Sequence, residues 1–86
     1  MGLATKKIAG EEKKILSTLG LEISKLRAKN NLSRNELADL AKLNVQYLYD
    51  VEVGKRNITI YVLAKLARAL NTTPSKLLKS NKLEPL

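Results

Sequence analysis

The sequence predicts an all-α domain of five helices, on three observations. Apolar residues recur three and four positions apart along most of the chain, which is the spacing of an amphipathic helix. The apolar set is almost wholly aliphatic, with no Phe and no Trp, and this suits small helices that pack closely. Helix-capping residues precede the periodic stretches, and only two prolines interrupt the chain. A chain of 86 residues is expected to form one domain.

A first helix is predicted over residues 11–30, preceded by a flexible N-terminal arm at residues 1–10. Acidic residues near the start of this helix and basic residues near its end complement the helix macrodipole. Gly20 costs about 1 kcal/mol relative to alanine inside a helix. It therefore marks either a close packing contact or a break in the helix. The apolar residues of this helix are Ile15, Leu16, Leu19, Ile23 and Leu26.

The next stretch, residues 32–56, reads as two short helices separated by a tight turn. Ser33 and Glu36 form a capping box at the start of the second helix, which runs to about Lys42. Asn44 caps a third helix that runs to about residue 53, and Gly54 ends it. These are the proportions of a DNA-binding helix-turn-helix. The predicted apolar stripe of the second helix is Leu37, Leu40 and Ala41.

Two further helices follow. Thr59 is expected to cap a fourth helix from Ile60 to Leu70. Thr73 is expected to cap a short fifth helix with Pro74 in its first position, where a missing N–H group costs nothing. The domain is thus expected to span residues 11–79, with a C-terminal tail at 80–86. The inward residues of the fourth helix are Val62, Leu63, Leu66, Ala67 and Leu70.

The charge balance predicts a polyanionic partner. There are 16 basic and 8 acidic residues, giving a net charge of +8, and no acidic residue occurs between residues 53 and 83. Such a balance favours binding to nucleic acid, with plain solubility as the alternative. The chain has no His, no Cys and no glycine-rich phosphate loop, so we expect no enzyme, metal site or cofactor. We also expect no small-molecule effector, no membrane span and a cytoplasmic, nucleoid-associated location.

Residues from four of the predicted helices carry a resemblance to a known family. The matching runs are Leu32-Ser33-x-x-Glu36-Leu37-Ala38, Leu43, Tyr47-Leu48-x-x-Val51-Glu52-x-Gly54-Lys55-Arg56 and Leu63-x-x-Leu66-Ala67-x-Ala69-Leu70. Through them the chain resembles the lambda-repressor-like helix-turn-helix family, also called the Cro/repressor or XRE family. The run Arg56-Asn57-Ile58-Thr59 also resembles the small controller proteins of restriction–modification systems.

The resemblance implies a sequence-specific transcriptional regulator, repressor-like, that binds a palindromic operator in double-stranded DNA as a dimer. It also implies a buried ion pair between Arg27 and Glu52. Two positions depart from the family pattern. Lys42 stands where glycine is common, and a positive φ there would cost lysine about 1 kcal/mol or more. Arg34 stands where glutamine is common. An antitoxin or a protein-interaction module with the same fold is the alternative function.

The third helix divides into two faces by phase, because Leu48 and Val51 must face the core. Its outward residues are the expected base contacts: Val45, Gln46, Tyr49 and Asp50. Gln46 suits adenine, Val45 a thymine methyl group and Asp50 the cytosine amino group. Phosphate contacts fix the register of a protein on DNA. Those expected here are Ser33, Arg34, Asn44, Tyr47, Lys55, Arg56 and Asn57. An ordinary solvated surface is the alternative for each residue.

Apolar residues outside these helix faces exceed what a small core needs. They predict a self-complementary dimer surface, with closure of the core as the alternative. The residues are Ile58, Ile60, Tyr61, Leu77 and Leu78.

Overall fold

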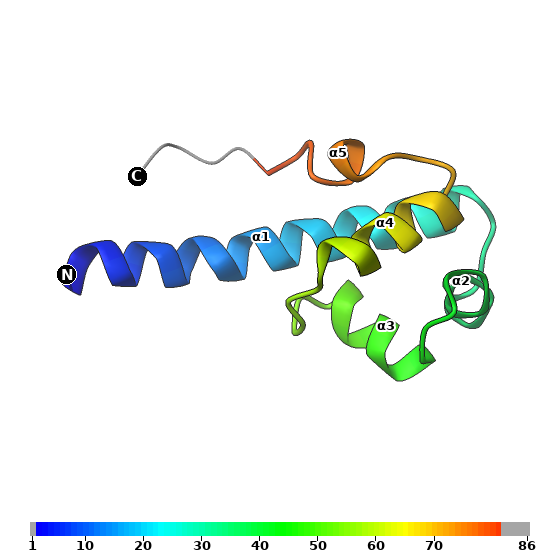
Figure 1. Cartoon of the computed structure of the whole chain (residues 1–86), viewed down its shortest axis with the longest axis horizontal. Coiled ribbons are helices and arrows are strands. Elements are labelled where there is room, and N and C mark those ends of the chain that lie inside the picture. The colour runs from blue at the N-terminus through cyan, green and yellow to red at the C-terminus, as the bar shows by residue number, and fades with distance from the viewer. Residues whose placement is uncertain (1, 82–86) are drawn as a thin grey trace.

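The computed structural model describes residues 2–81, and Figure 1 shows their arrangement. The described residues contain five helices, so the predicted all-α fold class is confirmed. Within these residues, no helix combines the length and the apolar character that crossing a membrane requires. The helices are α1 (Gly2–Lys29), α2 (Arg34–Ala41), α3 (Val45–Glu52), α4 (Ile60–Ala69) and α5 (Pro74–Leu77).

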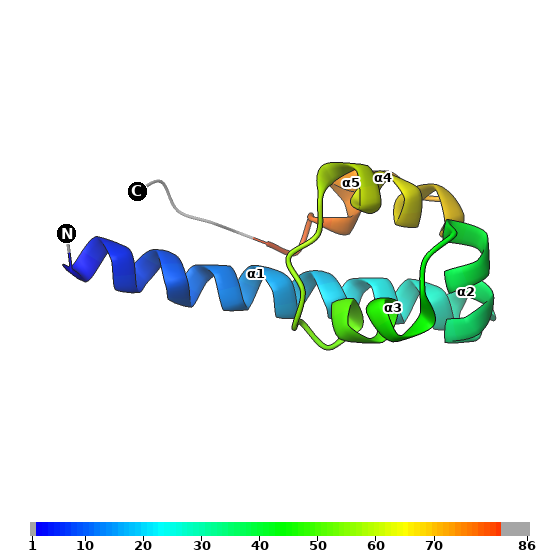
Figure 2. The ribbon, with the colours of Figure 1, turned by 60° about the horizontal axis from the view of Figure 1, so that its bottom comes forward.

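The first helix is longer than predicted. It begins at Gly2 instead of residue 11, so the backbone of the expected N-terminal arm is helical. Its first ten residues include alanines and lysines, which are good helix formers, and no proline. Both ribbon views show the N-terminal half of α1 extending beyond the other helices (Figures 1 and 2). Only Ser80 and Asn81 of the expected C-terminal tail lie within the described residues.

Gly20 is a close-packing position and does not break α1. A Cβ atom built on it would lie 2.4 Å from the backbone oxygen of Glu52 and 2.5 Å from that of Val51. Gly54, with φ of 80°, is similarly close to α1, because its Cβ atom would lie 2.9 Å from Ser17 Oγ. The two glycines therefore allow the end of α3 to lie directly against the middle of α1.

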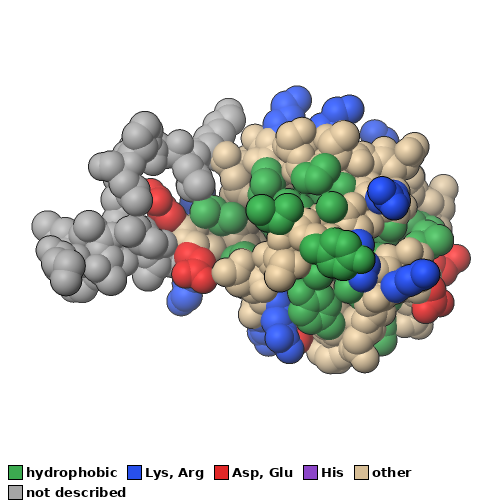
Figure 3. All heavy atoms as spheres, viewed as in Figure 1, with side chains coloured by type: hydrophobic (Ala, Val, Ile, Leu, Met, Phe, Trp, Pro, Cys, Tyr) green, Lys and Arg blue, Asp and Glu red, His purple; other side chains and the backbone are tan. Residues whose placement is uncertain are grey.

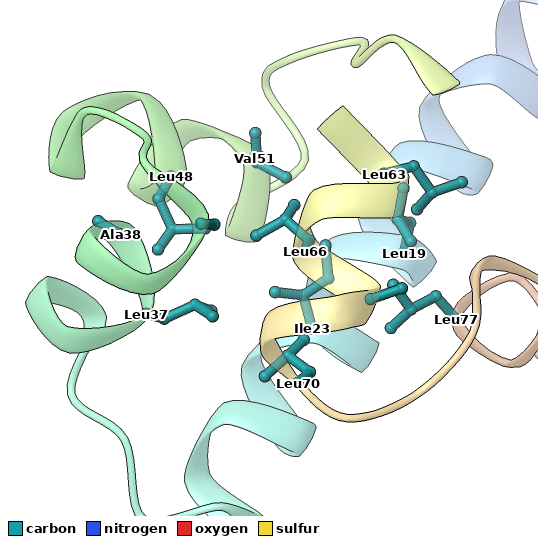
Figure 4. Close-up of a cluster of buried hydrophobic side chains, with 12 residues drawn as sticks. Leu19, Ile23, Leu37, Ala38, Leu48, Val51, Leu63, Leu66, Leu70 and Leu77 are labelled. Atoms are coloured by element: carbon teal, nitrogen blue, oxygen red, sulfur yellow. The ribbon is translucent and has the colours of Figure 1, made fainter. Parts of the chain in front are cut away.

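All five helices contribute to one aliphatic core (Figure 4). The middle of α1 supplies Leu19 and Ile23, and α5 supplies Leu77, which is fully buried. Leu77 is therefore not available for the dimer surface on which the sequence placed it. It closes the core because α5 packs against both α1 and α4 and Leu77 lies on the side that they cover. The remaining core residues are Leu37, Ala38, Ala41, Leu48, Val51, Leu63, Leu66, Ala67 and Leu70.

The predicted apolar stripe of α2 is wrong at one position. Leu40 is 60% exposed, whereas Ala38 is 2% exposed and faces the core. Each residue turns a helix by about 100°, so Leu37, Ala38 and Ala41 fall within one arc of about 100°. Leu40 lies about 60° outside that arc. The spacing pattern alone does not say on which side of Leu37 the neighbouring helices lie.

The predicted caps fix where the later helices begin. Ser33 Oγ accepts a hydrogen bond from the Glu36 N–H at 3.0 Å, and Glu36 Oε1 accepts one from the Ser33 N–H at 2.8 Å. Hydrogen bonding to the Glu36 carboxylate, first from the Ser33 backbone N–H and then from the Ser33 side chain, lowers the pKa of the Glu36 carboxyl. Lys42 ends α2 in the left-handed region, with φ of 55°. The other N-caps are Asn44, Thr59 and Thr73, as predicted.

Candidate nucleic-acid interface

The outer face of α3 carries the residues expected to face DNA bases. Leu48 and Val51 are buried, as their phase requires, so the opposite side of this short helix is left free. Val45, Gln46 and Tyr49 are exposed there, and Asp50 is partly exposed beside them. Asn44 holds the start of the helix, since its Oδ1 accepts hydrogen bonds from the N–H groups of Gln46 and Tyr47.

A buried ion pair joins this helix to α1. Arg27 Nε donates to Glu52 Oε2 at 2.8 Å, and Arg27 Nη2 donates to Glu52 Oε1 at 3.1 Å. The remaining Arg27 nitrogen, Nη1, donates to the Leu32 carbonyl at 3.1 Å. The Glu52 side chain is only 2% exposed. The geometry is the two-pronged arrangement in which arginine and carboxylate interact most strongly, and it fixes α3 against α1.

Arg34 is also bound to Glu52, which the sequence reasoning missed. Its Nε donates to Glu52 Oε1 at 3.2 Å, and its guanidinium lies over the Tyr49 ring, 5.0 Å from the centroid. The Arg34 side chain remains 37% exposed. One carboxylate thus links α1, α2 and α3. No local pattern signals the Arg34 contact, because the two residues stand 18 positions apart.

A second group of side chains lies on the outer face of α3 and on the loop after it. Gln46 Nε2 donates to Asp50 Oδ1 at 3.2 Å. Arg56 Nε lies 3.8 Å from Asp50 Oδ2, and the Arg56 guanidinium lies over the Tyr47 ring at 5.3 Å. Tyr47 itself packs against the hydrophobic core. The four-residue spacing of Gln46 and Asp50 could have signalled the first of these contacts, since such residues are neighbours on a helix.

The other expected phosphate contacts surround these two groups. Lys55, Arg56 and Asn57 are exposed in the loop between α3 and α4. The loop is anchored at its start, because the Lys55 N–H donates to the Asp50 carbonyl at 2.8 Å. Ser33 is exposed beside Arg34, and its hydroxyl is engaged in the capping box. These contacts bring the start of α2, the outer face of α3 and the following loop together.

Other exposed apolar residues lie at the start of α4 and directly after α5. Ile60 is 84% exposed and Tyr61 is 72% exposed, while Leu78 is 37% exposed. Figure 3 shows hydrophobic side chains near the centre of the face that α4 crosses, with Lys and Arg side chains around them. Lys65 Nζ lies over the Tyr61 ring at 5.3 Å. Ile58 differs from the others, because it is partly buried and packs against the core.

Comparison with known proteins gives matches over most of the chain. The model of the helix-turn-helix family matches residues 23–77. The control protein C.SmaI of Serratia marcescens is 41% identical over 64 residues, which are 74% of this chain and 76% of that protein. The control protein C.BamHI of Bacillus amyloliquefaciens is 33% identical over 60 residues, 69% of this chain and 74% of that protein.

Solved structures of bacterial controller and regulator proteins also match this chain. The restriction–modification controller protein C.AhdI from Aeromonas hydrophila matches with a TM-score of 0.70 at 37% identity, covering 72% of this chain and 94% of that one. The clp gene regulator ClgR from Corynebacterium glutamicum matches with a TM-score of 0.74 at 25% identity, covering 76% of this chain and 83% of that one.

Proposed function

The chain belongs to the helix-turn-helix family, and from this premise we propose that it is a controller protein that binds a palindromic operator as a dimer. The resemblance predicted from the sequence is confirmed. The protein is a sequence-specific DNA-binding transcriptional regulator and not an enzyme. Because its relatives include restriction–modification controller proteins, the genes we propose it controls are those of such a system. It would act in the cytoplasm, at the nucleoid.

The observation that carries the proposal is the pair of arginine–tyrosine contacts on either side of the α3 surface. Arg34 lies over Tyr49 from the start of α2, and Arg56 lies over Tyr47 from the loop after α3. Both guanidinium groups are therefore held near an exposed recognition helix, where they suit phosphate oxygens. An α-helix of this kind enters the major groove with its N-terminal residues nearest the base edges.

The proposed contacts follow this geometry. Gln46 would bind adenine through its amide, Val45 would touch a thymine methyl group, and Tyr49 and Asp50 would complete the base-facing surface. The remaining proposed contacts, all to the DNA backbone, are Ser33, Arg34, Asn44, Tyr47, Lys55, Arg56 and Asn57.

We place the dimer surface on the exposed apolar residues at the start of α4 and directly after α5. Ile60 and Tyr61 project from the first turn of α4, and Leu78 follows α5. Ile58 would support this surface from below. A two-fold symmetric contact there would present two α3 helices to successive major grooves, about 34 Å apart. Sedimentation that detects only monomer at tens of micromolar protein would count against this arrangement.

A pair of charge-removing variants tests the proposed DNA surface. Arg56→Ala removes a proposed phosphate contact, whereas Lys25→Ala removes the same charge from the exposed side of α1, away from both the α3 surface and the proposed dimer surface. We expect Arg56→Ala to weaken binding to all DNA sequences and to lower the salt slope by about 1. Lys25→Ala should change both quantities much less. Equal losses for the two variants in gel-shift titrations would mean that the DNA-binding surface lies elsewhere.

A further inference from the structure

The base-facing surface contains a carboxylate in an unexpected place. DNA is a polyanion, and a carboxylate on the recognition helix repels it. Asp50 nevertheless stands in the middle of α3, with its side chain 24% exposed. Its two oxygens are engaged by two different proposed contact residues. Oδ1 accepts a hydrogen bond from Gln46 at 3.2 Å, and Oδ2 lies 3.8 Å from Arg56 Nε.

We propose that Asp50 is a positioning residue for DNA reading, which orients the Gln46 amide for adenine and holds Arg56 beside it. The inference rests on the function proposed above and deepens it, because it assigns the specificity of the α3 surface to a pair of residues. Asp50 then acts on the base sequence through Gln46, and this role replaces the direct contact to a cytosine amino group that its residue type suggests.

The hydrogen-bonding groups of Gln46 and Asp50 determine which way the Gln46 amide points. A carboxylate only accepts hydrogen bonds, so the end of the Gln46 amide that faces Asp50 must be the NH₂ group. One N–H of that group is used by Asp50 Oδ1. The second N–H and the Oε1 atom remain free, and they form the donor and acceptor pair that matches adenine N7 and N6. The carboxylate thereby disfavours the flipped amide, which would present the pair in the opposite order.

The Asp50 side chain is itself held in place by contacts that lead back to the core. Arg56 approaches its other oxygen and also lies over the Tyr47 ring at 5.3 Å. Tyr47 packs against the hydrophobic core. A continuous series of contacts therefore leads from the core to Tyr47, Arg56, Asp50 and finally Gln46. A long glutamine side chain is otherwise free to rotate, and fixing it before binding lowers the entropy that binding must remove.

The binding site is first selected from random DNA, and DNA fragments that differ from it at one base pair are then compared in competition gel shifts. The protein variants tested on these fragments are Gln46→Ala, Asp50→Ala, Asp50→Asn and the double variant Gln46→Ala/Asp50→Ala. Asp39→Ala is the matched control, because it removes the same charge from an exposed position on α2. Among the side chains of residues 10–81, the Asp39 side chain takes part in no ion pair or side-chain hydrogen bond. Thermal melts verify that each variant is folded.

The base pair whose discrimination is lost in Gln46→Ala identifies the position that Gln46 reads. At that position we expect Asp50→Ala to lower the preference for adenine by roughly fivefold or more. Affinity for unrelated DNA should rise in the same variant, because a repulsive charge is gone. Asp39→Ala should leave every base preference unchanged. Asp50→Asn, which keeps an acceptor but also offers a donor, should lose less discrimination than Asp50→Ala.

Three results would overturn the inference. The first is unchanged discrimination at the Gln46 base pair in Asp50→Ala, which would remove the positioning role. The second is a preference lost at a different base pair, and lost equally in the Gln46→Ala background, which would show a direct Asp50 contact. The third is a Gln46→Ala variant with every base preference intact, because Asp50 would then have nothing to position. A wild-type protein without any sequence preference would instead overturn the proposed function, and this inference with it.

Discussion

The close contact between α1 and α3 at Gly20 predicts that a side chain added there lowers the stability of the protein. In Gly20→Ala, the added Cβ atom would lie 2.4 Å from the Glu52 carbonyl oxygen and 2.5 Å from that of Val51. Ordinary contacts begin near 3.4 Å, so the overlap with Glu52 is 3.4 − 2.4 = 1.0 Å. Both obstructing atoms belong to the α3 backbone, which cannot rotate out of the way as a side chain could. The two helices would have to move apart.

The expected change in the free energy of unfolding combines two opposing effects. Overpacking of a core contact costs about 1–3 kcal/mol, and two backbone oxygens place this site at the upper end. Alanine in a helix regains about 1 kcal/mol relative to glycine. The net loss is therefore about 2 kcal/mol of unfolding free energy. In a domain of this size, that corresponds to a fall in Tm of about 8–16 °C.

Gly10→Ala supplies the matched control for this measurement. Gly10 lies in the same helix, but its added Cβ atom would meet nothing within 4 Å. Only the higher helix propensity of alanine then acts, and Gly10→Ala should be more stable than the parent by up to about 1 kcal/mol. Thermal and urea denaturation followed by circular dichroism compare the two variants. If Gly20→Ala melts at or above the parent temperature, as Gly10→Ala should, the close approach of α3 to α1 is refuted.

Four further variants test the local structure. Lys42→Gly should raise the unfolding free energy by about 1 kcal/mol, because glycine adopts a φ of 55° without strain. Asn31→Gly should raise it less, because asparagine tolerates the left-handed region better than lysine does. Glu52→Ala leaves Arg27 without its partner and should cost about 3–5 kcal/mol in urea titrations, so an unchanged midpoint would contradict the ion pair. The Glu36 pKa is lowered on folding, so the carboxylate stabilises the protein above about pH 4.5, and this contribution is lost as the pH falls through the folded pKa. Glu36→Gln should therefore flatten the decline in Tm on the acid side, and parallel declines for both proteins would count against the capping box.

Local signals predicted most of the fold because the helix starts depend on neighbouring residues. Ser33, Asn44, Thr59 and Thr73 each cap the helix that follows, and each bond spans only two or three residues. Burial was less predictable, because it depends on which side of a helix the distant elements cover. Leu40 is exposed and Leu77 is buried for this reason. The role of Gly20 likewise depends on backbone oxygens at the end of α3, more than 30 residues away.

The candidate interface could be predicted only in part for a similar reason. The outward face of α3 follows from the phase of Leu48 and Val51, which is local information. The contacts that organise that face are not local. Arg34 reaches Glu52 across 18 positions, and Arg56 reaches Asp50 only because the chain turns back at Gly54. Residue types were therefore enough to identify which side chains lie on the outer face of α3, and the structure was needed to show which of them contact one another.

Selection of bound sequences from random DNA measures how this chain reads a DNA sequence. If two copies of this chain read DNA through α3, the enriched sites should contain two half-sites related by two-fold symmetry. Their centres should lie about one helical turn, roughly 34 Å, apart. The preference within each half-site should weaken in Gln46→Ala. Selection that enriches no sequence, together with binding that is steeply salt-dependent on any DNA, would contradict the account and leave only a non-specific basic protein.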